Sequence, residues 1–189
     1  MELAHRFATG GEAELEEAIA LYGEKLVRYA ASVLYSHQDA EDVIQDVFLY
    51  AYQNRHRFDG KNLQAWLYKI AYNDCLDKLK GKKRRKLFFL FDMNEEPTTD
   101  MEDVVSISEI NDALRKLKPN ERALLYGRIV DGQSYDELSR IMGTSPSTLR
   151  KQYERIKKKA ARYLNDCGYG MQYEPPRTTN PKGGQFYDA

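Results

Sequence analysis

The chain has 189 residues, enough for one ordinary domain or two small ones, and its 42% of apolar residues can supply packed cores. Its 29 basic and 29 acidic residues cancel, which alone neither favours nor excludes nucleic acid, because binding depends on the local field. No apolar run approaches the ~20 residues that cross a bilayer, and the N-terminus lacks an apolar signal core. Cys75 and Cys167 have no CxxC partner or histidine cluster. We therefore expect a cytoplasmic protein with reduced thiols, without a metal site and without membrane insertion.

Charge is distributed unevenly along the chain. A first basic cluster spans nine residues and contains Lys78, Lys80, Lys82, Lys83, Arg84, Arg85 and Lys86. A second basic cluster contains Arg150, Lys151, Arg155, Lys157, Lys158, Lys159 and Arg162. Residues 87–114 between them hold no Lys or Arg but many carboxylates. This pattern predicts two positive surfaces separated by an acidic linker, which we assign to residues 87–105.

Apolar periodicity predicts a first domain of three helices over residues 10–86. One face of the first helix carries Leu15, Ile19, Tyr22, Leu26, Tyr29 and Val33. The second helix, which Asp39 can cap, runs to about Arg57 with an inner stripe of Val43, Ile44, Val47, Phe48 and Ala51. After an Asp59-Gly60 turn, Asn62 can cap a third helix, which we expect either to end near Gly81, a suitable C-terminal cap, or to be extended by the basic run that follows. Its predicted inward side chains are Trp66, Leu67, Ile70, Ala71 and Leu79.

A second helical domain is predicted over residues 106–167. Its first helix begins with a Ser106-x-x-Glu109 capping box, carries Ile110, Ala113, Leu114 and Leu117, and ends at Pro119. A helix from Asn120 to about Gly132 follows, with Leu124, Leu125 and Ile129. The composition of residues 168–189, rich in Gly, Pro, Thr and Asn, predicts a flexible C-terminal tail.

Residues 135–158 have the pattern of a helix-turn-helix. A second capping box, Ser134-x-x-Glu137, precedes a short helix; Gly143 opens the turn, and Pro146 suits the first position of the next helix. Leu149, Tyr153, Ile156 and Ala160 share the face expected to pack on Leu138 and Ile141. The opposite face presents Arg150, Lys151, Glu154, Arg155 and Lys158, residue types that read base edges and neutralise phosphates. The alternative is a helical hairpin with a solvated basic face; the turn and the caps favour DNA binding.

Three segments resemble the extracytoplasmic-function (ECF) sigma factors of bacterial RNA polymerase. DAEDVIQDVF at 39–48 resembles their polymerase-binding helix, and FDGKNLQAWLYKIAYN at 58–73, continuing to residue 80, resembles the segment that reads and opens the minus-10 promoter element. SYDELSRIMG at 134–143, continuing through residue 150, looks like their minus-35 reader. Order and spacing match over residues 15–164. Ser147, Lys151 and Gln152 depart from residues common in the family, so the promoter sequence cannot be transferred from relatives.

The resemblance implies a role for each surface. Asp42, Gln45 and Asp46 would dock on the clamp helices of the largest polymerase subunit, and Leu125 and Ile129 would hold the flap of the second-largest subunit. The minus-35 duplex would be read by Ser147, Thr148, Arg150, Lys151, Glu154, Arg155 and Lys158. The minus-10 element would contact Asn62, Trp66, Lys69, Asn73, Lys80, Lys82, Lys83, Arg84 and Arg85, with a base flipped from the non-template strand held near Asn62. An anti-sigma factor could cover the same surfaces.

Other interpretations remain open at this stage. Asn62 could be only a helix cap, the acidic face of the second helix could be merely solvated, and the linker could be a tether rather than a segment that enters the RNA exit path. A helix-turn-helix regulator without sigma activity is the alternative function, and polymerase binding by residues 39–48 discriminates between the two. A sigma-like protein that binds polymerase but not DNA is a third class. We find no nucleophile–base pair, Gly-rich phosphate loop or metal cluster; His5, His37 and His56 are scattered, so neither catalysis nor a cofactor is expected.

Overall fold

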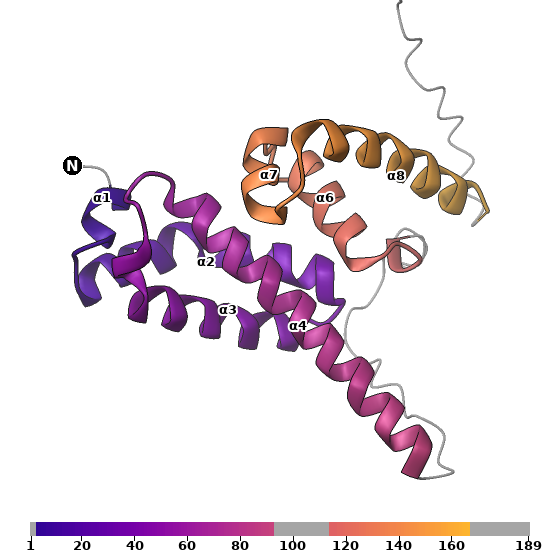
Figure 1. Cartoon of the computed structure of the whole chain (residues 1–189), viewed down its shortest axis with the longest axis horizontal. Helices are drawn as coiled ribbons and strands as arrows, with labels where there is room; N and C mark the ends of the chain where they lie inside the picture. Colours follow the sequence, from indigo (N-terminus) through magenta and orange to yellow (C-terminus); the bar gives the residue numbers. More distant parts are fainter. Residues whose placement is uncertain (1–2, 93–113, 167–189) are drawn as a thin grey trace, which may run out of the picture.

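The structure, a computed structural model, describes residues 3–92 and 114–166, and these ranges are helical without any strand. In chain order the elements are α1 (Leu3–Phe7), α2 (Glu12–Leu34), α3 (His37–Gln53), the short 3-10 helix η1 (Arg55–Arg57), α4 (Leu63–Asp92), α6 (Pro119–Ile129), α7 (Tyr135–Met142) and α8 (Pro146–Asp166). The predicted all-α class with two helical domains is confirmed (Figure 1).

The first domain is an antiparallel hairpin of α2 and α3 with α4 packed across it (Figure 1). All members of the stripe predicted for α3 are buried, as are Leu26, Tyr29 and Val33 of α2. Each buried Val, Leu, Ile or Phe side chain among them contributes about 1.5–3 kcal/mol when it leaves water. The prediction for Ile19 is wrong, because its side chain is 44% exposed and Ala18 takes the buried position on that turn. Side chains spaced alternately four and three residues apart repeat every 3.5 residues on average, whereas the helix has 3.6 residues per turn. Over a helix as long as α2, such a row of side chains therefore rotates gradually away from the buried face.

Local signals account for most helix ends of the first domain, with one correction. The Oδ1 atom of Asn62 accepts a 2.9 Å hydrogen bond from the backbone amide of Ala65, so the predicted cap of α4 is confirmed. The cap of α3 is Ser36 rather than Asp39, because the Ser36 hydroxyl accepts the amide of Asp39 at 3.2 Å. Of the two ends considered for α4, the structure has the longer one: the helix continues past Gly81 to Asp92, since the Lys and Arg run that follows favours helix and one glycine costs only about 1 kcal/mol.

The second domain packs α6, α7 and α8 around a small core of its own. Ser134 and Glu137 form the predicted capping box, and Gly143 ends α7 in the left-handed conformation at φ +66°. That backbone conformation strains side chains with a Cβ, which is why glycine suits this turn. The core contains Leu117, Leu124, Leu138, Leu149 and Ile156. The helix-turn-helix is thus assembled largely as its sequence predicts.

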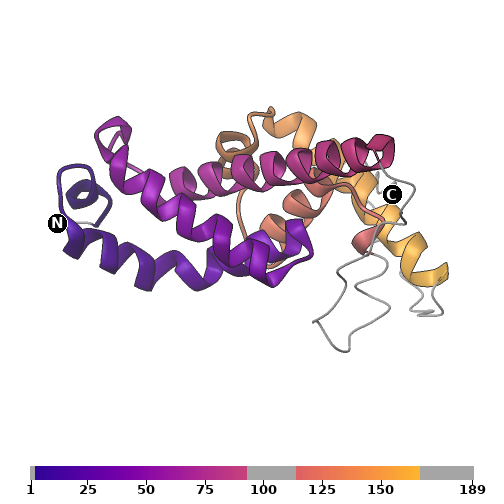
Figure 2. The ribbon, with the colours of Figure 1, turned by 90° about the horizontal axis from the view of Figure 1, so that it is seen from below.

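The two domains also pack directly on each other. The second domain lies along the side of α2 and α4 that faces away from α3 (Figure 1 and Figure 2), with α6 on α2 and α7 on α4. Ala123 and Ile141 belong to the buried core of the first domain rather than to that of their own. The expectation that Ile141 packs under α8 is therefore wrong, because α7 lies between α8 and α4 and shows an apolar side chain to each.

Several predicted features lie outside the described residues. They are the linker beyond Asp92, the capping box of Ser106 and Glu109, and the tail at 168–189. Within the described ranges, none of the helices combines the length and apolar character that a bilayer span requires.

Candidate nucleic-acid interface

The outward face of α8 is the first candidate surface. All side chains predicted to read the minus-35 element are exposed there: Ser147, Thr148, Arg150, Lys151, Glu154, Arg155 and Lys158. The guanidinium of Arg150 lies over the ring of Tyr135, 5.2 Å from its centroid, and Tyr135 meets Tyr153 edge to face at 6.2 Å. An aromatic ring beneath the guanidinium favours one placement of a long side chain, so Arg150 is partly oriented in the free protein.

The N-terminal turn of α8 is organised by serine and threonine hydroxyls. The Ser145 hydroxyl accepts the backbone amide of Thr148 at 3.3 Å and lies 2.8 Å from the Thr148 hydroxyl. Ser147 joins this cluster with its hydroxyl 3.2 Å from that of Ser145. A helix N-terminus with free amides attracts phosphate, and the cap leaves the hydroxyls exposed for contacts with DNA.

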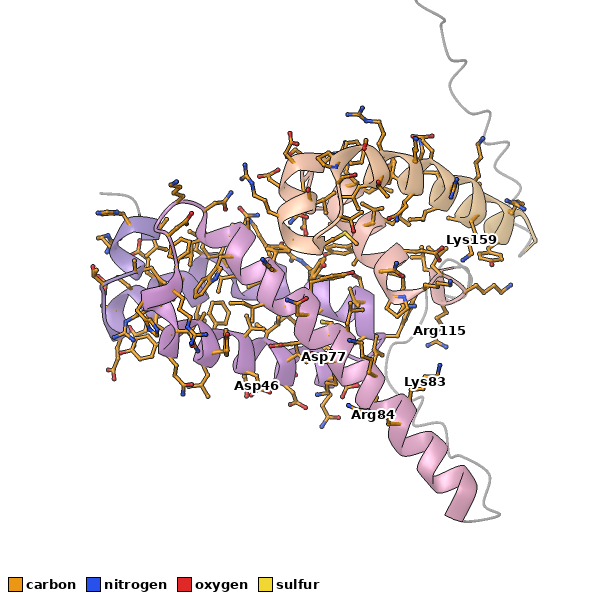
Figure 3. All side chains as sticks on the ribbon, in the orientation of Figure 1. Asp46, Asp77, Lys83, Arg84, Arg115 and Lys159 are labelled. Carbon is orange, nitrogen blue, oxygen red and sulfur yellow. The ribbon has the colours of Figure 1, made fainter. Side chains whose placement is uncertain are left out.

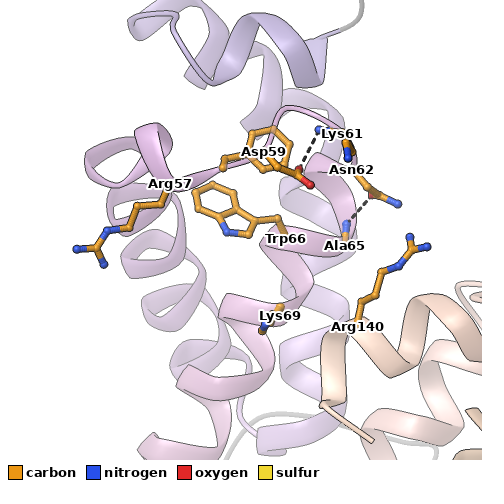
Figure 4. A pocket seen from close by; sticks show the side chains of 9 residues that line it. Arg57, Asp59, Lys61, Asn62, Ala65, Trp66, Lys69 and Arg140 are labelled. Atoms are coloured by element: carbon orange, nitrogen blue, oxygen red, sulfur yellow. Dashed lines mark hydrogen bonds between the residues drawn. The ribbon is translucent and has the colours of Figure 1, made fainter. Parts of the chain in front are cut away.

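A hollow at the start of α4 is the second candidate surface (Figure 4). It encloses about 550 Å³ and is lined by Arg57, Phe58, Asp59, Lys61, Asn62, Ala65, Trp66, Lys69 and Arg140. It therefore contains three residues predicted to bind the minus-10 strand: Asn62, Trp66 and Lys69. Cationic groups, an amide and an aromatic ring in one hollow provide what a single-stranded nucleotide needs: charge for phosphate, hydrogen bonds for a base edge and a surface for stacking.

Aromatic packing fixes the floor of this hollow. Trp66 stacks on Phe58 with ring centroids 5.1 Å apart, and Phe7 of α1 meets Trp66 edge to face at 6.4 Å. Phe7 is only 1% exposed, so α1 supports Trp66 from behind. The Asp59 carboxylate accepts the backbone amide of Lys61 at 3.1 Å and holds the loop that leads into α4.

The reasoning from sequence missed Arg57, Lys61 and Arg140 in this hollow. The first two flank the predicted turn, and their nearness to Asn62 in the chain was a usable signal. Arg140 belongs to α7, 78 positions after Asn62, and reaches the hollow only because the domains pack together (Figure 4).

The rest of α4 presents the first basic cluster. Lys69, Asn73, Lys80, Lys82, Lys83 and Arg84 are exposed, and the side chain of Arg85 lies outside the described part. Lys83 and Arg84 stand on the part of α4 that projects beyond the hairpin (Figure 3). Lys82 forms an ion pair with Asp39, and Lys80 pairs with Asp77 at 2.8 Å. These two lysines would exchange a carboxylate for phosphate on binding DNA, whereas Lys83 and Arg84 point into solvent.

An acidic face on α3 adjoins the first basic cluster, because α3 carboxylates pair with Lys78 and Lys82 of α4. Asp42, Gln45 and Asp46 are exposed, as predicted, and the Asp42 carboxylate pairs with Lys78 at 3.2 Å. Burial opposes ionisation of Asp39 at the start of this helix, but hydrogen bonds from Lys82, Ser36 and Lys78 outweigh it and lower its pKa. Leu49 continues the face one turn further and is 56% exposed, an apolar residue that the sequence reasoning had left out. The sequence did contain a signal for this residue, because Leu49 lies outside the stripe predicted to be buried and is therefore expected at the surface.

The second domain has an apolar exposed surface at the end of α6. Ile129 is 62% exposed, Val130 beside it is similarly exposed, and Leu125 is half-buried. Leu124, by contrast, is fully buried in the core. Leu125 and Ile129, the two residues of this domain predicted to contact polymerase, are thus at least partly accessible.

Few side chains among the described residues are suited to metal binding or nucleophilic catalysis. His5, His37 and His56 are all exposed, and no group of three or more His, Cys, Asp or Glu side chains in the described ranges is arranged to hold a metal ion. Burial raises the pKa of the Cys75 thiol to about 12, so this cysteine is protonated at neutral pH and makes a poor nucleophile.

Two cationic faces on two packed helical domains, one of them a helix-turn-helix, are typical of a DNA-binding protein. Family models agree with this class: Sigma-70 region 2 matches residues 18–85, and Sigma-70, region 4 matches residues 107–159. The chain belongs to the ECF sigma factors of bacterial RNA polymerase, and its function is promoter recognition in transcription initiation.

Relatives and solved structures resemble the chain over most of its length. The ECF RNA polymerase sigma factor SigM of Mycobacterium tuberculosis is 24% identical over 182 residues, which cover 90% of this chain and 87% of SigM. RNA polymerase sigma factor CarQ of Myxococcus xanthus is 26% identical over 160 residues, covering 80% and 92%. The structure of CnrH in complex with the cytosolic domain of CnrY has a TM-score of 0.67 at 22% identity, covering 87% and 96%. RpoE in complex with the anti-sigma factor NepR from Bartonella quintana has a TM-score of 0.65 at 23% identity, covering 79% and 96%.

Proposed function

We propose that this sigma factor divides promoter recognition between its two domains while both are bound to core polymerase. The observation that carries this proposal is the presence of two distinct exposed cationic surfaces. One is the face of α8 in the second domain, and the other is the hollow at the start of α4, which the first domain lines apart from Arg140. Each surface has a different chemistry, and each suits a different form of DNA.

The α8 face suits duplex DNA. Its N-terminal half would enter the major groove, where Arg150 can donate two hydrogen bonds to a guanine and Glu154 can accept from a cytosine amino group. Lys158, further along the helix, would neutralise a phosphate without reading sequence. In the free protein Glu154 pairs with Lys157 at 2.9 Å. A cytosine amino group would replace this ion pair, and the loss is small because an exposed ion pair contributes little free energy.

The hollow suits an unpaired base. We propose that Asn62 reads the edge of a base flipped from the non-template strand and that Trp66 supports the loop beside it. Lys69 and Asn73 would contact the neighbouring backbone, and Lys83 and Arg84 would follow the phosphates of the duplex upstream. Capturing one base offsets the few kcal/mol that unpairing costs, so the chain can help open DNA without ATP hydrolysis.

Polymerase would bind the surfaces that DNA does not use. Asp42, Gln45 and Asp46, extended by Leu49, provide carboxylates and an amide for a basic helical partner, the clamp of the largest subunit. Ile129 and Leu125 provide an apolar surface for the flap of the second-largest subunit. Phosphodiester chemistry would then belong to polymerase alone, and the factor would work in the cytoplasm.

An anti-sigma factor is a further proposed partner. The structures of CnrH and RpoE above are of complexes with the cytosolic domain of CnrY and with the anti-sigma factor NepR, respectively. The fold similarity to both supports the expectation that a protein of this kind can hold the present chain inactive.

Co-elution with core polymerase tests the proposal against the alternative of a stand-alone helix-turn-helix regulator. We expect the purified chain to elute with core polymerase on size exclusion, and Asp46→Lys to abolish this. Glu16→Lys, which reverses an exposed carboxylate on α2, is the matched control and should bind like the wild type. A chain that never co-elutes, yet binds duplex DNA sequence-specifically, would establish the regulator instead.

A further inference from the structure

Tyr135 contacts side chains from both neighbouring helices of the second domain. It is the first residue of α7, and the capping box of Ser134 and Glu137 fixes the backbone at this point. Its half-buried ring packs against the core of the second domain. The ring also meets that of Tyr153 of α8 edge to face at 6.2 Å, a favourable geometry for two aromatic side chains. The placement of Tyr135 is therefore set by its own domain, before any partner binds.

Two guanidinium groups from different helices lie near this ring. That of Arg128, in α6, is 4.6 Å from the ring centroid, and that of Arg150, in α8, is 5.2 Å from it. Arg128 is half-buried and also donates to the backbone carbonyl of Gln133, two residues before Tyr135, so it belongs to the fixed surroundings of the ring. Arg150 is exposed, and within the described ranges its guanidinium forms no hydrogen bond or ion pair. The ring is therefore what orients Arg150 there.

Contact with an aromatic ring leaves the donors of an arginine free. A guanidinium stacks on a ring through its flat face, whereas its N–H groups point outward in its own plane. Arg150 can therefore stay over Tyr135 while its outer N–H groups donate to the O6 and N7 atoms of one guanine. The ring thus supports the reading geometry in the complex as well as in the free protein, and it does not compete with the base.

The orientation of Arg150 affects sequence selectivity more than general affinity for DNA. An arginine side chain has several rotatable bonds, and fixing them costs conformational entropy. Two hydrogen bonds to one guanine tolerate a narrow range of placements, whereas a contact with phosphate tolerates many and reads no sequence. A ring that already favours one placement reduces the ordering that base reading requires. Loss of the ring should therefore weaken the reading of one base pair and leave phosphate contacts unchanged.

We propose that Tyr135 is a positioning residue for promoter reading, and that its ring holds the guanidinium of Arg150 where it can read one base pair of the minus-35 element. The proposal rests on the proposed role of the α8 face in reading duplex DNA. It assigns part of the sequence selectivity to a half-buried residue of α7 that acts through another side chain and not on a base. A cation over an aromatic ring at an exposed site shifts an equilibrium by about two- to fivefold, which sets the size of the expected effect.

Tyr135→Leu is the direct test, in holoenzyme reconstituted from core polymerase and full-length variants. Leucine keeps an apolar side chain on the core but removes the aromatic face, and Tyr135→Met does the same with a longer side chain. Competition between the strongest promoter selected from a genomic library and versions with one altered minus-35 base pair measures selectivity at each pair. The pair read by Arg150 is the one at which Arg150→Ala loses selectivity. At this pair alone, both Tyr135 variants should lose about two- to fivefold.

Three comparisons separate positioning from a structural or a phosphate-binding role. Tyr135→Phe keeps the ring and removes the hydroxyl, so it should have wild-type selectivity. In an Arg150→Ala background, Tyr135→Leu should change selectivity no further, because Tyr135 acts only through Arg150. Tyr163→Leu is the matched control and should keep wild-type selectivity. Tyr163 also packs on this core and has Lys116 and Lys159 near its ring, at 5.2 and 5.9 Å, but it lies near the other end of α8 (Figure 1).

Unchanged or higher selectivity of Tyr135→Leu and Tyr135→Met at the pair read by Arg150 would overturn the proposal. An equal loss at every pair in both variants would overturn it too, since it shows a structural role. A uniform loss of affinity in Tyr135→Phe would assign the hydroxyl to a phosphate instead. Failure of the proposed function has a different signature, because Arg150→Ala would then keep its selectivity at every base pair, and the positioning role would fall with the reading role of α8.

Discussion

Asn62 has two separable roles, and substitutions that divide them test the proposed capture of a base. Its Oδ1 atom caps α4 by accepting the amide of Ala65 at 2.9 Å. Asn62→Ala removes this cap and should lower the free energy of unfolding by about 1 kcal/mol. Asn62→Asp keeps an equally good acceptor, so its stability should stay within about 0.5 kcal/mol of the wild type. Thermal unfolding followed by circular dichroism measures this difference.

In promoter opening, the two variants should instead behave alike. An amide both donates to and accepts from a base edge, whereas a carboxylate only accepts and repels the nearby phosphates. Losing one such pairing costs about 1–3 kcal/mol, a factor of about 5 to 150 in the open complex. Permanganate reactivity of minus-10 thymines in the holoenzyme complex measures this loss at the strongest promoter selected from a genomic library. If Asn62→Asp opens that promoter as well as the wild type does, Asn62 is only a helix cap and the reasoning is refuted.

Three further predictions concern other parts of the molecule. Arg150→Ala should reduce discrimination at one minus-35 base pair by about 1–3 kcal/mol in competition binding, and unchanged selectivity would contradict its placement. Hydrogen bonds from the backbone and hydroxyl of Ser134 lower the pKa of Glu137, so its contribution to stability is present above its unfolded pKa of about 4.3 and is lost as pH falls through the folded value. In Glu137→Gln the free energy of unfolding should therefore fall less steeply at acidic pH than in the wild type. An identical dependence on pH in the two proteins would contradict this. Phe7→Ala should destabilise the first domain by about 3 kcal/mol or more and shift Trp66 emission to longer wavelength; unchanged emission would show that α1 does not support Trp66.

Features encoded in neighbouring residues could be predicted from the sequence. Asn62 caps α4, Gly143 turns the chain between α7 and α8, and Ser134 and Glu137 form their box, because each depends on residues within about four positions. The exposed reading face of α8 follows from the same local periodicity. The end of α4 stayed open between Gly81 and the basic run, because a glycine signal competes with the helix preference of the residues after it.

Features that depend on the docking of one domain on the other could not be predicted. Arg122 looks in the sequence like any exposed arginine of a helix, yet it is buried against carbonyls about 90 positions away. Ile141 was assigned to the wrong core and Arg140 was left out of the site for the same reason. The periodicity of α7 shows that it has an apolar face but not that α4 covers part of it.

Run-off transcription tests the central claim most directly. Purified core polymerase would transcribe a fragmented genomic library with and without this chain. The account predicts new, discrete start sites that share two upstream elements, and that disappear when Asp46→Lys replaces the wild type. The same start sites with and without the chain, under conditions where it co-elutes with core polymerase, would contradict a factor that reads promoters.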